Sequence, residues 1–147
     1  MAATYIVGAI GVFIGFKGLS SNPPTMRWGT LLAVGGGGVL SFVRHSLLHR
    51  SDAARMRWDL GRRNNFQIEV GLANLAWGLA AIIVVALNLP IATQAAVCLT
   101  MGIYLFAVFV MQLLFPGGQR RGIGPLIGIG TFGAVLIIMG GMGLAAA

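Results

Sequence analysis

Most of this chain consists of apolar runs that are long enough to cross a lipid bilayer, separated by short polar segments. The hydrocarbon core of a bilayer is about 30 Å thick, and an α-helix spans it in about 20 residues. Such runs lie at 4–19, 28–43, 68–87, 91–115 and 123–146. They take up most of the 147 residues, so little length is left for any other domain. We therefore expect an all-α integral membrane protein, a single domain built as a bundle of five transmembrane helices.

The second run carries the weakest helix signal because it contains four successive glycines at 35–38. A glycine inside a helix costs about 1 kcal/mol relative to alanine in water. The sequence leaves open whether this segment is straight, kinked or unwound. If it does not span the membrane, the bundle has four crossings instead of five.

The composition excludes a water-soluble globular protein. Hydrophobic residues make up 57% of the chain and charged residues 9%, with a mean hydropathy of +0.88. An ordinary soluble domain is about 25% charged. The single cysteine, Cys98, lies inside an apolar run, so neither an internal disulfide nor a thiol metal site within one chain is possible.

The net charge of +7 points to lipid headgroups and not to nucleic acid, because the basic residues lie in short loops beside apolar runs. We expect anionic lipids to be bound by Arg50, Arg55, Arg57, Arg120 and Arg121.

The distribution of these charges predicts an orientation. With five crossings, eight arginines lie on the same side as the N-terminus, while only Lys17 and Arg27 lie on the opposite side. Basic loop residues favour the cytoplasm. We therefore expect a cytoplasmic N-terminus and a C-terminus outside the cytoplasm.

A short interfacial helix is predicted at about 52–60. Ser51 is suited to cap its beginning, Asp52 lies favourably at its positive end, and Gly61 is suited to end it. Its apolar and charged residues fall on different sides, which is typical of a helix lying in the membrane interface.

Glycines recur at helical spacing on three of the expected helices. Membrane helices associate through close packing at small residues. The sequence therefore predicts close helix contacts, within one chain or between copies, and we expect a homo-oligomer or a subunit of a larger membrane complex. The packing positions are Gly11 and Gly15, Gly71 and Gly78, and Gly124 and Gly128.

A polar cluster of Gln67, Glu69 and Asn74 opens the third expected helix. Glu69 is the only glutamate, and an acid inside a membrane is a functional candidate because its burial is costly. The alternative is an ion pair that holds the helix end in place. Gln67 and Asn74 are seven residues apart, so they share one face of the helix. Glu69 lies on a different face. The candidate ion-pair partners are Arg44, Arg62 and Arg63.

Two histidines, His45 and His49, are four residues apart and would share a face if the second helix continued past the membrane surface. This spacing can hold a metal, but a structural site usually needs four ligands. We therefore interpret them as interfacial residues and weak metal candidates, and the sequence assigns no cofactor.

The run FQIEVGLANL at 66–75, preceded by a stretch rich in histidine and arginine, resembles a signature of the form FQ-x-EVG-x-AN. This signature occurs in a family of small, uncharacterised bacterial multi-pass membrane proteins, and the resemblance spans about 43–81. It implies a bacterial inner membrane and an importance for Gln67, Glu69 and Asn74. It implies no reaction.

The chain is also similar in size to membrane enzymes of eicosanoid and glutathione metabolism, which carry arginine, asparagine and glutamate near the start of their second helix. In those enzymes the glutamate is the third residue after the asparagine, whereas here Glu69 is the fourth residue after Asn65. One extra residue rotates the pair by about 100° around a helix, which weakens this resemblance.

These observations give three hypotheses for the function. The first is a non-enzymatic membrane subunit or scaffold that packs through its glycine-rich helices. The second is a small oligomeric transporter or channel in which Glu69 acts with Gln67 or Asn74 of a neighbouring chain. The third is a glutathione-type enzyme that uses Arg62, Arg63 and Glu69 to hold an anionic cosubstrate.

Overall fold

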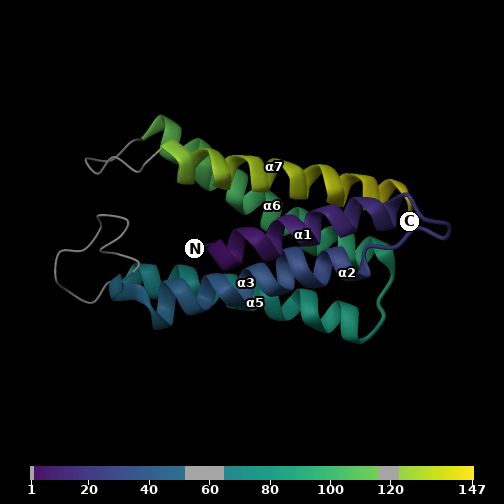
Figure 1. The fold of residues 1–147 in the computed structure, drawn as a ribbon, viewed down its shortest axis with the longest axis horizontal. Helices are drawn as coiled ribbons and strands as arrows, with labels where there is room; N and C mark the ends of the chain where they lie inside the picture. The colour runs from purple at the N-terminus through teal and green to yellow at the C-terminus, as the bar shows by residue number, and fades with distance from the viewer. Residues whose placement is uncertain (1, 52–64, 116–122) are drawn as a thin grey trace.

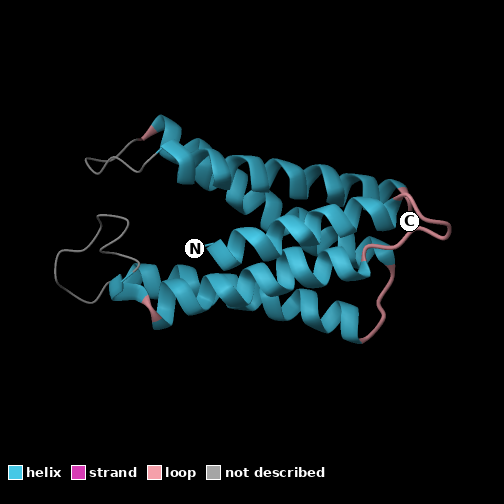
Figure 2. Cartoon of the chain, in the orientation of Figure 1, coloured by secondary structure: helices cyan, strands magenta, loops and turns pink. Residues whose placement is uncertain are grey.

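The computed structural model describes residues 2–51, 65–115 and 123–147, and within these ranges the chain is helical apart from short loops and contains no strand (Figure 2). Four of the helices are α1 (Ala2–Leu19), α5 (Asn65–Ala86), α6 (Ile91–Leu114) and α7 (Ile123–Ala145). Between α1 and α5 the chain forms one continuous helix over residues 27–47, which we call the composite helix. It consists of α2 (Arg27–Thr30), η1 (Leu31–Gly36), α3 (Gly37–Phe42) and η2 (Val43–Leu47), where η denotes a π-helical segment.

Three of these helices, α5, α6 and α7, are long and apolar enough to cross a membrane, with 22, 24 and 23 residues. The apolar helix Ala3–Leu19 is shorter. The described part of the chain therefore has the fold of a helical membrane protein, as the apolar runs predicted. The number of crossings stays a prediction.

The glycines at 35–38 are helical and not unwound. Gly36 has φ −63° and ψ −45°, and the amide of Gly37 donates to the carbonyl of Leu32, five residues earlier. The cost of glycine in a helix is offset here by close approach of a second helix. A Cβ atom at Gly35 would already touch the side chain of Ile82, and one at Gly38 would lie 2.8 Å from Cα of Gly78.

The composite helix lies between α1 and α5, and α6 and α7 form an antiparallel pair (Figure 1). Within this pair α7 packs against α1, whereas α6 packs against α5 and the composite helix. The loops at 20–26 and 87–90 and the C-terminus lie at one end of the bundle. Glycine again allows the closest contacts in the α6–α7 pair, since a Cβ atom at Gly133 would lie 2.7 Å from the amide nitrogen of Phe106.

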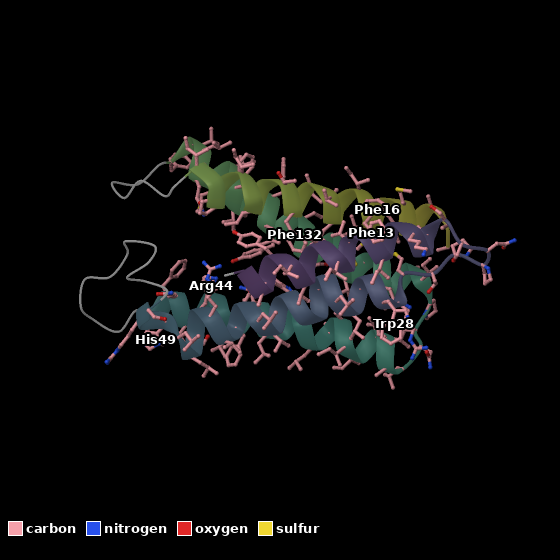
Figure 3. The ribbon with its side chains drawn as sticks, viewed as in Figure 1. Phe13, Phe16, Trp28, Arg44, His49 and Phe132 are labelled. Carbon is pink, nitrogen blue, oxygen red and sulfur yellow. The ribbon has the colours of Figure 1, made fainter. Side chains whose placement is uncertain are left out.

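The core lies between the composite helix, α5, α6 and α7. Thr30 of the composite helix and Cys98 of α6 are both completely buried, and their side chains approach to 3.5 Å. Phe16 and Phe132 border this core from α1 and α7, whereas Phe13 faces outward (Figure 3). The fully buried apolar side chains include Met26, Val34, Leu136 and Met139.

Candidate functional site

The polar residues of the predicted cluster lie on two different sides of α5. Gln67 and Asn74 are buried, with 2% and 4% of their surfaces exposed, and they share a face with Gly71 and Gly78. This face packs against the composite helix. The spacing of seven residues places both amides on that face, as the sequence indicated.

The buried face of α5 is a close contact between helix backbones. Ser46 Oγ donates to the carbonyl of Ile68 at 3.1 Å, and a Cβ atom at Gly71 would collide with Ser46. Further along, a Cβ atom at Gly78 would lie 3.1 Å from the carbonyl oxygen of Gly35. The side-chain amide of Asn74 forms a hydrogen bond within α5, in which Nδ2 donates to the carbonyl of Val70 at 2.7 Å. These groups therefore serve helix packing.

Glu69 lies on the opposite, outer face of α5. It is exposed, and within the described ranges it makes no hydrogen bond or ion pair. Its neighbours on this face are large apolar side chains, and it is the only acidic residue that the structure describes. The exposed apolar residues of this face are Phe66, Leu72, Leu79 and Ile83, with 73%, 51%, 46% and 52% of their surfaces exposed.

The expected ion pair between Glu69 and Arg44 is not present. Arg44 belongs to η2 and is half-buried, and its side chain lies on the side of the composite helix where α1 begins (Figure 3). Glu69 faces away from the composite helix, so the contact between α5 and the composite helix separates the two charges. The other two candidate partners, Arg62 and Arg63, lie outside the described residues.

The two histidines do not share a helix face. The composite helix ends at Leu47, and Leu48 has φ −101° and ψ 23°, which turns the chain before His49. His49 lies at this end of the bundle, and its Nδ1 is 2.9 Å from the carbonyl oxygen of Ser46 (Figure 3). No group of three or more metal-binding side chains occurs among the residues that the structure describes.

The interfacial helix predicted at 52–60 lies outside the described residues and stays a prediction. Helical residues begin at His49, two residues before Ser51. The hydroxyl of Ser51 donates back to the carbonyl of Leu48 at 3.0 Å. Arg50 is exposed at this end. The other predicted lipid-binding arginines, Arg55, Arg57, Arg120 and Arg121, are not among the described residues.

The glycines of α1 pack inside the chain. A Cβ atom at Gly11 would collide with Ala33, and one at Gly15 with Met139. On α7, Gly128 lies against the ring of Tyr5, whereas a Cβ atom at Gly124 would meet no described atom within 4 Å. Gly124 therefore takes no part in the packing of the described chain.

Several contacts were not anticipated from the sequence. Gly29 is the partner of Gly15, and a Cβ atom there would lie 2.9 Å from the amide nitrogen of Gly15. Gly29 and Ala33 have the same spacing of small residues as Gly11 and Gly15, so this signal was available. A tilted contact between the rings of Trp77 and Tyr104, with centroids 4.4 Å apart and ring planes at 52°, joins α5 to α6. No local feature of the sequence indicated this contact.

Within the described ranges, the fold and the arrangement of these residues define a helical membrane protein with a glycine-packed interior and one outward acidic side chain. The chain belongs to a family of unknown function, DUF6790, whose model matches residues 4–122. The match covers α1 to α6 and ends before α7. No curated protein and no solved structure matches the chain significantly.

Proposed function

We propose that this chain is a non-enzymatic integral membrane subunit that associates with other proteins in a bacterial inner membrane. The observation that carries this proposal is the separation of Glu69 from the buried amides of Gln67 and Asn74. The interior of the bundle is occupied by glycine-mediated helix packing, and the only described acid lies on the outside. An outward polar group on a membrane helix is available to a neighbouring protein.

The proposed subunit crosses the membrane five times. The composite helix has 21 residues over 27–47, which corresponds to about 30 Å of helix and is enough to cross the hydrocarbon core. Successive helices run in alternating directions in Figure 1, which supports five crossings. Arg44 and Arg50 lie at the end where the composite helix stops, and six further arginines occur in the sequence at 52–64 and 116–122. Because basic loop residues favour the cytoplasm, the proposed subunit has a cytoplasmic N-terminus, and this end faces anionic lipid headgroups.

The geometry gives less support to a transporter. In that hypothesis Glu69 acts together with Gln67 or Asn74 from a neighbouring chain. Both amides are buried against the composite helix, so a neighbouring chain reaches neither of them. The glutathione-type enzyme gains no support either, because Asn65 and Glu69 are both exposed, and Arg62 and Arg63 lie outside the described residues.

Native mass spectrometry of the protein, released in mild detergent from the membrane of its own host after crosslinking in cells, tests this proposal. We expect one copy of the chain in an assembly with at least one different protein, together with bound anionic lipids. The control is the same chain expressed in an unrelated host that lacks the partner, where we expect a monomer. Recovery from its own host only as a monomer, or only as multiples of its own mass, would contradict the proposal.

A further inference from the structure

Glu69 is the only charged residue on the outer face of α5, where large apolar side chains surround it and the exposed Asn65 lies one turn before it. The outer face of α5, formed by Phe66, Glu69, Leu72, Leu79 and Ile83, carries no other charged residue. The outward faces of α6 and α7 carry no charged side chain within the described residues. Lys17 and Arg27 are exposed at the far end of the bundle, so they cannot reach Glu69.

The position of Glu69 along α5 places its Cα just inside the expected hydrocarbon boundary. α5 has 22 residues, so its length of about 33 Å only slightly exceeds the hydrocarbon thickness of about 30 Å. Glu69 lies four residues after Asn65, which is about 6 Å along the helix axis from its beginning. Ionised side chains at such positions face other protein groups or water and are paired with opposite charges.

From this placement we propose that the outer face of α5 is the docking surface for a transmembrane helix of a different protein, which carries a lysine or arginine about one turn inside its cytoplasmic end. The cation pairs with Glu69, and the apolar residues of the face pack on either side of the pair. This inference rests on the proposed role as a membrane subunit and adds the surface and the chemistry of the partner.

A second copy of this chain fits the surface less well. Dimers with two-fold symmetry are the commonest assemblies, and they place the same patch of both copies in contact. Two α5 helices paired in this way would bring Glu69 close to Glu69 of the other copy, and like charges in a medium of low dielectric constant repel. The charge on this face therefore favours a basic partner over self-association.

Photo-crosslinking in the host membrane tests the proposal. A photoreactive amino acid at Leu72, one turn from Glu69, is expected to give one adduct of defined mass. We expect the crosslinked peptide to come from a transmembrane helix with a lysine or arginine near its cytoplasmic end. The matched control is the same amino acid at Ile138 of α7, which is similarly exposed (56% against 51%) on the other side of the bundle, and it is expected to give no such adduct.

The charge dependence of the adduct tests the chemistry of the partner. Glu69→Gln is expected to reduce the Leu72 adduct by about tenfold, corresponding to about 1.4 kcal/mol. Glu69→Lys is expected to abolish the adduct. Replacing the lysine or arginine of the partner helix with glutamate is expected to restore the adduct in the Glu69→Lys variant. Because Glu69 contacts no described polar group, the Gln variant should elute and melt like the unmodified protein.

Three results would overturn the proposal: a Leu72 adduct only with lipid, an adduct only with a second copy, or an adduct unaffected by Glu69→Gln. If native mass spectrometry shows a partner but Leu72 does not crosslink to it, the role as a subunit stands and the docking surface is wrong. If no partner is found at all, the proposed function fails first.

Discussion

Replacing Gly38 with alanine is expected to lower the melting temperature of the detergent-solubilised protein by roughly 5–10 °C. The added Cβ atom would lie 2.5 Å from the carbonyl oxygen of Asn74 and 2.8 Å from Cα of Gly78. Both are backbone atoms of α5, so no side chain can rotate away, and the two helices have to separate. Overpacking of this kind costs about 1–3 kcal/mol.

Gly37 provides the matched control for Gly38. It is the adjacent residue of the same glycine run and is also helical, but a Cβ atom there would meet nothing within 4 Å. Gly37→Ala is therefore expected to leave the melting temperature unchanged or to raise it slightly, because alanine favours a helix more than glycine does. Tryptophan fluorescence during heating measures both variants. Equal melting of Gly37→Ala and Gly38→Ala would show that the composite helix does not pack on α5 as described.

Replacing Gly29 with alanine is expected to open the contact between α1 and the composite helix. The added Cβ atom would lie 2.9 Å from the amide nitrogen of Gly15 and 3.1 Å from the carbonyl oxygen of Gly11. The next residue, Thr30, contacts the thiol of Cys98, so displacement of Gly29 also disturbs the core. We expect alkylation of Cys98 by a maleimide to become roughly tenfold faster, because local opening exposes this thiol more often.

Cys98 is a specific reporter because it is the only cysteine of the chain and is completely buried. The control is Gly141→Ala on α7, where a Cβ atom would meet no described atom within 4 Å. Mass spectrometry after timed maleimide exposure gives the labelling rates. If Gly29→Ala were labelled as slowly as Gly141→Ala, the contact between Gly15 and Gly29 would not support the bundle.

The helical periodicity of α5 allowed the faces of its residues to be predicted. Gln67, Gly71, Asn74 and Gly78 follow spacings of three and four, so they had to share a face, and Glu69 had to lie elsewhere. The periodicity could not identify what each face contacts. A helix in a membrane has an apolar surface on every side, and the sequence therefore did not indicate that Gly71 and Gly78 meet the composite helix of the same chain.

The glycine run at 35–38 was difficult to predict because the glycine penalty measured in water favours an unwound segment. In the bundle, Gly38 allows the backbone of α5 to approach, which outweighs that penalty. The end of the composite helix was predicted poorly for a different reason. Leu48 turns the chain without a proline or glycine, so no residue signals the break between His45 and His49.

Disulfide formation between Ser46 and Gly71 positions most directly tests whether the glycine-lined faces pack within one chain. These positions are chosen because a Cβ atom at Gly71 would meet the side chain of Ser46. The double variant Ser46→Cys, Gly71→Cys is made in a Cys98→Ala background, so that it contains no other thiol. After mild oxidation in the membrane we predict a monomer with no free thiol, and no dimer when the two single-cysteine variants are expressed together. Disulfide-linked dimers from the co-expressed single variants would contradict this, because the contact would then join two copies.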